Sequence, residues 1–117
     1  MDMTTIFSNL INNSIDSFEE RKIIDERIIK ITYGITEKGF EINYCDNGKG
    51  LDKTFENKED IFLAFTTSKV DRHGNEIGTG LGMYLVKSVI DDNNGNVQIL
   101  EPEKGFEIRL LFPLNFN

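Results

Sequence analysis

The stretch from Gly78 to Val89 reads GTGLGMYLVKSV and has glycines at Gly78, Gly80 and Gly82, directly before a run with helical apolar spacing. Glycine adopts backbone conformations that other residues avoid, and a tight glycine turn exposes its backbone N–H groups. The first turn of a helix leaves further N–H groups without intrahelical partners. A glycine turn that leads into a helix is therefore typical of a site for anions, phosphates above all.

A second set of polar residues lies near the N-terminus, where Asn9, Asn13 and Asp16 would share one stripe of a helix. A solvated polar face gives the same spacing. Asparagine is nevertheless a poor helix former, and its carboxamide oxygen is a hard ligand of the kind that magnesium accepts. The stripe is therefore either an ordinary solvated face or, if it borders a cleft, part of a magnesium site.

A third set follows a β-rich run, where Asp46 precedes Gly48 and Gly50 in CDNGKGLD. An aspartate at a strand end can accept a hydrogen bond from an amino group, and alternating glycines let a flat ring approach the backbone. Ordinary turns produce the same pattern. A fourth set, in FLAFTTSK, could offer a phosphate the hydroxyls of Thr66, Thr67 and Ser68 and the cation of Lys69, or could be a core segment that runs into a loop.

Hydrophobic periodicity predicts the elements that position these residues. We expect an amphipathic helix over 4–20, strands over 27–34 and 39–45 that form a hairpin, a polar and mobile loop over 66–78, a second helix from the glycine stretch to about residue 90, and strands over 96–100 and 105–112. The apolar faces expected for the two helices are Ile6, Phe7, Leu10, Ile11, Ile15 and Phe18, and Leu81, Leu85, Val86, Val89 and Ile90. Gly95 suits the left-handed position after the second helix. The class is α+β, with one sheet and helices on one face.

Length and charge limit the function classes. The chain has 117 residues, 38% of them apolar, and a net charge of −7. This is one soluble domain's worth of sequence, and its acidity argues against a broad nucleic-acid footprint or direct contact with an anionic membrane surface. Cys45 is the only cysteine, so an intramolecular disulfide is impossible. The sequence has no apolar run of membrane-spanning length and no signal pattern, and we expect a cytoplasmic location, whether or not a parent protein is membrane-anchored.

Taken in order, the asparagine helix, the Asp-x-Gly-x-Gly turn, the Phe-rich segment with threonines and lysine, and the Gly-x-Gly-x-Gly turn resemble the ATP-binding domain of the GHKL superfamily. That superfamily joins histidine kinases, gyrase B-type topoisomerase subunits, MutL-type repair proteins and the large heat-shock chaperones. The resemblance extends from Ile6 to Pro113. It implies a two-layer α+β sandwich, in which a mixed, mostly antiparallel sheet carries about three helices on one face.

The resemblance also implies roles for individual residues. Asn13 would bind Mg²⁺ and Asn9 would support the ion or its waters, so both are expected metal residues. Asp46 would accept the adenine amino group, and Lys69, in an ATP lid over 66–78, would reach the γ-phosphate; Asn9 and Lys69 are the expected catalytic residues. The residues expected to contact ATP are Asn13, Asp16, Asp46, Gly48, Gly50, Leu51, Phe62, Thr66, Thr67, Gly78, Thr79, Gly80, Leu81 and Gly82.

Asn9 favours one branch of the superfamily. The ATP-hydrolysing branches generally carry a glutamate at this place, which acts as the general base, and an asparagine cannot take that proton. The sequence thus looks like the catalytic domain of a sensor histidine kinase, which binds ATP and Mg²⁺ and donates the γ-phosphoryl group to a histidine on a separate helical dimerisation domain. A response regulator would be the downstream partner.

Some residues depart from the family pattern. His73 is the only histidine and lies in the polar segment DRHGNE, so we expect an exposed loop residue rather than the phosphoacceptor. Phe106 and Glu107 stand where the family commonly places a hydroxyl that helps to hold adenine. The helix begins almost at Met1, which indicates one domain cut from the C-terminal end of a longer protein. The alternatives are an ATPase module of the chaperone or MORC-like type and a non-catalytic nucleotide-binding interaction domain.

Overall fold

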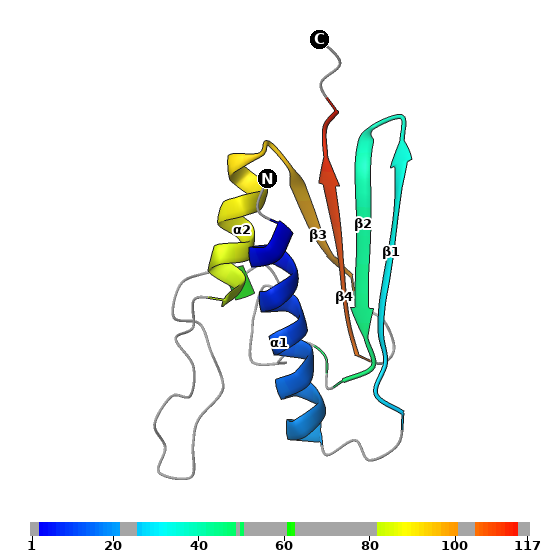
Figure 1. The fold of residues 1–117 in the computed structure, drawn as a ribbon, viewed down its shortest axis with the longest axis vertical. Helices are drawn as coiled ribbons and strands as arrows, with labels where there is room; N and C mark the ends of the chain where they lie inside the picture. The colour runs from blue at the N-terminus through cyan, green and yellow to red at the C-terminus, as the bar shows by residue number, and fades with distance from the viewer. Residues whose placement is uncertain are drawn as a thin grey trace.

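The structure is a computed structural model that describes residues 3–21, 26–48, 50, 61–62, 82–100 and 105–114. Along the chain the elements are α1 (Met3–Arg21), β1 (Ile29–Thr36), β2 (Gly39–Asp46), α2 (Gly82–Asp92), β3 (Asn96–Leu100) and β4 (Phe106–Phe112), as Figure 1 shows. The predicted helices and strands are all found, with ends that differ by one or two residues at most positions. The predicted mobile loop over 66–78 lies outside the described residues.

The strands form one sheet in the order β1-β2-β4-β3, and each neighbouring pair is antiparallel. The predicted α+β class and the predicted hairpin over β1 and β2 are confirmed. Among the described strands the sheet is purely antiparallel rather than mixed. The described residues contain two α-helices, where about three were expected.

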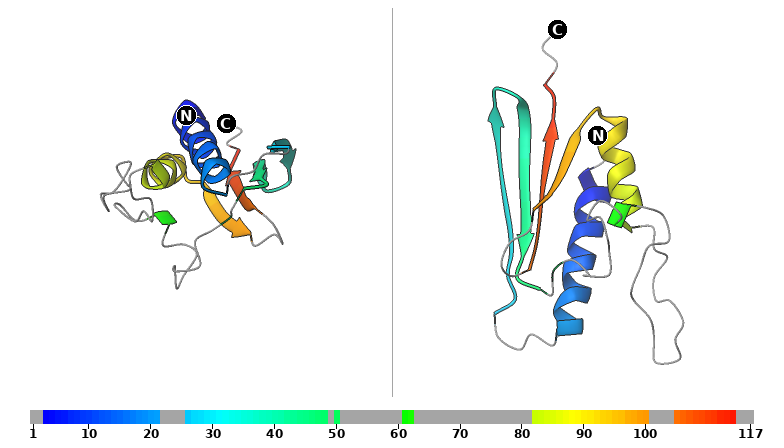
Figure 2. Two further views of the ribbon diagram at one scale, coloured as in Figure 1. Left: turned by 90° about the horizontal axis from the view of Figure 1, so that it is seen from below. Right: turned by 180° about the vertical axis from the view of Figure 1, so that it is seen from behind.

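Both helices cover the same face of the sheet, as the view along the strands in Figure 2 shows. Strand residues alternate between two faces, so every second residue of β2 and β4 points toward the helices. The buried core contains Ile6, Leu10, Ile42, Tyr44, Ile61, Phe62, Val86, Ile90, Ile99, Ile108, Leu110 and Phe112. Within the described ranges, no helix combines the length and the apolar character that a membrane crossing requires.

The buried stripe of α1 changes character along its length. Its first half supplies Ile6 and Leu10 to the apolar core, whereas Ser14 and Ser17 are buried further along. Ile15, which the periodicity placed on the apolar face, is 47% exposed, so that assignment was wrong. The reason is helical spacing: Ser14, Ser17 and the buried Phe18 continue the stripe at intervals of three to four residues from Leu10, and Ile15 falls beside it.

Helix α2 also corrects two expectations. Leu85 is exposed rather than part of the apolar face, which is formed by Val86 and Ile90. Asn94, with a φ of 56°, takes the left-handed position that was assigned to Gly95, and the amides of Asn94 and Gly95 close the helix end on Asp91 and Ile90. Gly95 is needed for another reason: a Cβ there would lie 2.8 Å from the Phe112 ring.

Strand β1 forms the edge of the sheet, and its apolar side chains are left largely uncovered. Ile31 and Tyr33 pair with Tyr44 and Ile42 of β2, so they point to the same face as the core. Tyr33 is nevertheless 76% exposed and Ile35 is 74% exposed. The well-packed core therefore ends at β2, and the polar residues at the end of that strand lie beside it.

Candidate functional site

Asp46 ends β2 as a buried carboxylate with a partner on each oxygen. It is 8% exposed. The Gly48 amide donates to Oδ1 at 2.8 Å, and the Ser14 hydroxyl of α1 donates to Oδ2 at 2.7 Å. Burial of a charged group is costly unless such hydrogen bonds compensate for lost water. The two contacts fix the carboxylate between the helix and the turn that follows the strand.

The Asp46 contact continues into the core through a tyrosine. The Tyr44 hydroxyl lies 2.5 Å from Ser14 Oγ and 3.0 Å from the Leu10 carbonyl oxygen, and Tyr44 and Ser14 are both almost fully buried. Burial raises the pKa of Tyr44 above 10.0; the Ser14 hydrogen bond lowers this pKa in part, and the negative charge of Asp46 adds to the increase. The phenol is therefore protonated at neutral pH and can donate a hydrogen bond.

The glycines around Asp46 are required by close packing within the protein. A Cβ on Gly48 would lie 2.1 Å from Ser17 Oγ, and one on Gly105, whose φ is +82°, would lie 1.8 Å from the Asp46 carbonyl oxygen. Gly50, with a φ of +79°, likewise faces the Gly105 carbonyl oxygen, 2.6 Å from its own would-be Cβ. These contacts explain the alternating glycines without a ligand, so the predicted lining of an adenine ring by Gly48 and Gly50 stays a prediction.

Phe106 lies directly beside this site. It is the register partner of Asp46 in the β2–β4 pair and packs against the apolar core, half-buried. Paired residues of antiparallel strands project to the same face, about 4.5 to 5.5 Å apart at Cβ. The departure noted in the sequence is therefore a local one, because an apolar ring stands next to the carboxylate at the place where a hydroxyl was expected.

The two predicted magnesium residues face the start of α2. A Cβ on Gly82, the first residue of that helix, would lie 3.1 Å from Asn9 Oδ1 and 4.0 Å from Asn13 Oδ1. The Asn9 amide nitrogen donates to the Thr5 carbonyl at 2.7 Å, which leaves its oxygen on the side toward Gly82. Both asparagines are half-buried. The fold thus brings together the asparagine stripe and the last glycine of the glycine turn.

These amide oxygens suit a magnesium ion by their chemistry. Magnesium prefers oxygen donors and usually keeps several waters and phosphate oxygens, so it needs only one or two protein ligands. The described part of the chain holds no cluster of three or more His, Cys, Asp or Glu residues that could bind a metal by itself. Any magnesium held here would consequently share the asparagines with a ligand that brings its own oxygens, as a nucleotide phosphate does.

The remaining predicted residues divide into two groups. Asp16 is exposed on α1, and Phe62 is 6% exposed within the apolar core. The others lie outside the described residues, and their roles stay predictions: Leu51, Thr66, Thr67, Lys69, Gly78, Thr79, Gly80 and Leu81. His73 lies outside them as well.

Sequence reasoning missed Ser14, which donates a hydrogen bond to Asp46, and Tyr44, which contacts Ser14. A usable signal was present, since Tyr44 stands two residues before Asp46 and therefore on the same face of β2. Ser14 directly follows Asn13, and a hydroxyl on the buried stripe of α1 needs a partner. What the sequence did not contain was the register between helix and strand that makes the two residues neighbours.

Comparison with known proteins identifies the family. A sequence model of the histidine kinase-, DNA gyrase B- and HSP90-like ATPases matches residues 1–115. The chain belongs to this ATPase family. Among curated relatives, a probable C4-dicarboxylate sensor kinase of Bacillus subtilis is 32% identical over 97% of the chain, and the sensor histidine kinase ZraS of Escherichia coli K12 is 27% identical over 97%. The chain spans only 20% and 22% of the lengths of these two relatives.

Solved structures of the ATPase family share the fold. The catalytic domain of histidine kinase ThkA matches with a TM-score of 0.66 at 26% identity, over 96% of this chain and 68% of that one. The histidine kinase domain of the E. coli osmosensor EnvZ matches with a TM-score of 0.60 at 23% identity, over 97% and 66%. The predicted resemblance to the ATP-binding domain of histidine kinases is confirmed.

Proposed function

We propose that this domain binds ATP with Mg²⁺ as the catalytic domain of a sensor histidine kinase, and that it donates the γ-phosphoryl group to a histidine on a separate helical domain. A response regulator would then receive the phosphoryl group from that histidine. One observation carries the proposal: α1 faces Asp46 through Ser14, and it also directs the amide oxygens of Asn9 and Asn13 at the start of α2. A base-binding carboxylate and a phosphate-side metal site that border the same helix fit a nucleotide.

Each part of the site has a defined task in this proposal. Asp46, held by Ser14 and Gly48, accepts the adenine amino group. The N-terminus of α2 offers backbone N–H groups to phosphate oxygens, and the asparagine oxygens of α1 face that end. Magnesium, when bound, neutralises phosphate charge and orients the transferred group. Lys69 is proposed to reach the γ-phosphate.

Asn9 determines the kind of reaction that we propose. Its amide nitrogen is engaged with the Thr5 carbonyl, and its amide oxygen has no useful basicity, so Asn9 cannot activate a water molecule. Transfer to an imidazole requires no such base, because the imidazole nitrogen is itself the nucleophile. We therefore expect the isolated domain to bind ATP and to hydrolyse it slowly. We also propose a cytoplasmic location, where ATP is available.

Calorimetric titration of the purified chain tests this proposal. We expect ATP to bind, to bind more weakly after magnesium is removed, and to bind more tightly than GTP. The variant Asp46→Asn should lose much of the preference for ATP over GTP, because an amide presents one acceptor and one donor group in place of the acceptor-only carboxylate. Absence of ATP binding, or rapid hydrolysis without an acceptor, would contradict the proposal.

A further inference from the structure

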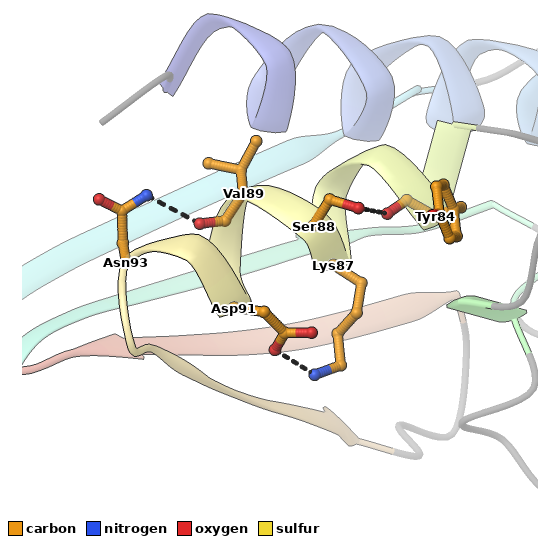
Figure 3. A network of polar contacts seen from close by, with 6 residues as sticks. All are labelled: Tyr84, Lys87, Ser88, Val89, Asp91 and Asn93. Carbon is orange, nitrogen blue, oxygen red and sulfur yellow. Dashed lines mark hydrogen bonds and ion pairs between the residues drawn. The ribbon is translucent and has the colours of Figure 1, made fainter.

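Ser14 makes an unusual hydrogen bond for a serine inside a helix. Such a hydroxyl commonly bonds the carbonyl one turn earlier in its own helix. Ser88 in α2 does so, donating to the Tyr84 carbonyl at 3.0 Å, as Figure 3 shows. Ser14 instead reaches across to Asp46 Oδ2 at 2.7 Å. The same type of residue in the two helices thus has two different partners.

The two serines differ because the carbonyl group four residues before each of them has a different hydrogen-bond donor. The equivalent carbonyl for Ser14 is that of Leu10, and the Tyr44 hydroxyl lies 3.0 Å from its oxygen. The Tyr84 carbonyl, by contrast, accepts from Ser88 of its own helix and, within the described residues, from no side chain of another element. Tyr44 therefore competes with Ser14 for the Leu10 carbonyl, and this competition leaves the serine hydroxyl available for Asp46.

The protons available fix the direction of the chain of hydrogen bonds. An ionised carboxylate only accepts, so Ser14 must donate its single proton to Asp46. The single Tyr44 proton then faces two acceptors, Ser14 Oγ at 2.5 Å and the Leu10 carbonyl oxygen at 3.0 Å, and is shared between them, since neither has a proton left for the tyrosine. The raised pKa of Tyr44 agrees with this direction, because it keeps the proton on the phenol. The chain of donors runs from Tyr44 to Ser14 to Asp46.

We propose that Tyr44 is a positioning residue for the nucleotide: it holds the Ser14 proton on Asp46 Oδ2 and thereby orients the carboxylate that receives the adenine amino group. This inference rests on the proposed function, in which Asp46 is the adenine acceptor. Ser14 and Gly48 each occupy one of the several lone-pair sites of the carboxylate. The remaining sites have a fixed direction, so the amino group meets an acceptor that need not reorganise.

A purely structural role for Tyr44 predicts a different result, and one pair of ligands separates the two. Purine riboside triphosphate lacks the 6-amino group of ATP and is otherwise the same. Damage to the pocket as a whole weakens both ligands alike. Loss of carboxylate orientation weakens ATP alone, because only ATP presents the amino group. The ratio of the two dissociation constants within each variant is therefore the decisive quantity.

The experiment titrates both triphosphates, with Mg²⁺, into the unaltered chain and into Tyr44→Phe, Ser14→Ala and the double variant. We expect the preference for ATP to fall about 3- to 10-fold in Tyr44→Phe, comparable to the net contribution of one ordinary hydrogen bond. In that variant Ser14 can turn to the Leu10 carbonyl and leave Asp46. Ser14→Ala removes the same contact with Asp46, so it should cause a similar loss. The double variant should lose no more than either single one, since one chain of contacts is broken in all three.

Tyr33→Phe is the matched control, because it removes a phenol from exposed strand β1, outside this chain of contacts. It should leave the preference unchanged. An NMR readout without nucleotide provides a second test: the Gly48 amide, which donates to Asp46 Oδ1, should shift in Tyr44→Phe and Ser14→Ala and stay in place in Tyr33→Phe.

An unchanged preference in both Tyr44→Phe and Ser14→Ala, with a normal preference in the unaltered chain, would overturn the inference and leave the proposed function intact. If the unaltered chain does not distinguish the two triphosphates, the role of Asp46 in the proposed function fails, and this inference fails with it. Should Tyr44→Phe not fold, Ser14→Ala and the Gly48 signal still decide, since the serine substitution removes only one hydroxyl.

Discussion

Ser14 and Asp46 are almost entirely buried, whereas Asn9 and Asn13, slightly earlier on the same helix, are only half-buried. Around Asp46 both carboxylate oxygens have protein partners, and the backbone of Gly105 packs against the backbone of Asp46. Around Asn9 the contact to α2 is a side-chain oxygen against a glycine. Helix α1 thus borders two polar sites. Backbone packs against backbone at the Asp46 site, whereas a side-chain oxygen makes the contact at the Asn9 site.

The difference matches the ligands that we propose. A base presents a fixed pattern of donors and acceptors, so a carboxylate that is already oriented loses little conformational freedom when the base binds. Phosphates and magnesium move during phosphoryl transfer, and magnesium keeps part of its water shell. Amide side chains at a partly exposed junction can follow such changes. We therefore expect substitutions near Asp46 to affect stability and those near Asn9 to affect metal-dependent binding.

The largest effect should come from Gly105→Ala. The substitution forces a non-glycine residue to a φ of +82° and places a Cβ 1.8 Å from the Asp46 carbonyl oxygen, so backbone must move. We expect a loss of about 2 to 4 kcal/mol in the free energy of unfolding, measured by urea denaturation. Gly34→Ala is the control, because a Cβ at Gly34 meets nothing within 4 Å. Equal stability of the two variants would remove the distinction between the two sites.

The next effect should come from Asn13→Ala, on binding rather than on stability. Loss of one amide ligand should weaken ATP binding about tenfold with Mg²⁺ and much less without it, which is about 1.4 kcal/mol by calorimetry. The free energy of unfolding should stay within about 0.5 kcal/mol, because alanine is the better helix former. Asn12→Ala, at an exposed position of α1, serves as control and should bind normally. An equal loss with and without Mg²⁺ would exclude Asn13 as a metal residue.

The comparison also shows how far sequence reasoning extends. The periodicity of apolar residues predicted the helices and strands, because each element of this fold buries one face. Periodicity alone did not connect Asn9 and Asn13 with the glycine turn. Only the family resemblance assigned them to one nucleotide site, and the structure brings both asparagines next to Gly82. Local spacing places residues on the same face of one element. It does not determine which face of another element they meet.

Ser14, Tyr44 and Gly95 illustrate what remained inaccessible. The network at Asp46 depends on the packing of α1 on β2, and Ser14 and Tyr44 are 30 residues apart in the sequence. Gly95 was assigned to a left-handed conformation that Asn94 in fact adopts, since asparagine also tolerates that conformation. The contact of Gly95 with Phe112 is tertiary. Spacing along the chain contains no information about such contacts.

A smaller effect should come from Gly82→Ala, which alters the junction without removing a polar group. The new Cβ would lie 3.1 Å from Asn9 Oδ1, a contact that the side chain can relieve by moving a few tenths of an ångström. We expect stability within about 0.5 kcal/mol of the unaltered domain. The affinity for ATP with Mg²⁺ should fall only about 2- to 4-fold, less than 1 kcal/mol. Isothermal titration and urea denaturation measure the two quantities, and a stability loss like that of Gly105→Ala would show that this junction is rigid as well.

The smallest effect should appear only in alkaline solution and concerns Tyr44. Its pKa is raised above 10.0 in the folded domain, chiefly by burial, so the unfolded chain releases this proton at a lower pH than the folded one. The unfolded state then binds fewer protons, and stability falls as the pH rises above about 10. Below that pH the contribution is constant. The difference in unfolding free energy between the unaltered domain and Tyr44→Phe should therefore narrow between pH 9 and pH 11, when both are measured by urea denaturation at about equal ionic strength. Tyr33→Phe provides the comparison outside the network. If the difference in unfolding free energy does not change with pH, the buried phenol ionises as readily in the folded domain as in the unfolded chain. The site at Asp46 would then be as adaptable as the contact of Asn9 and Asn13 with α2.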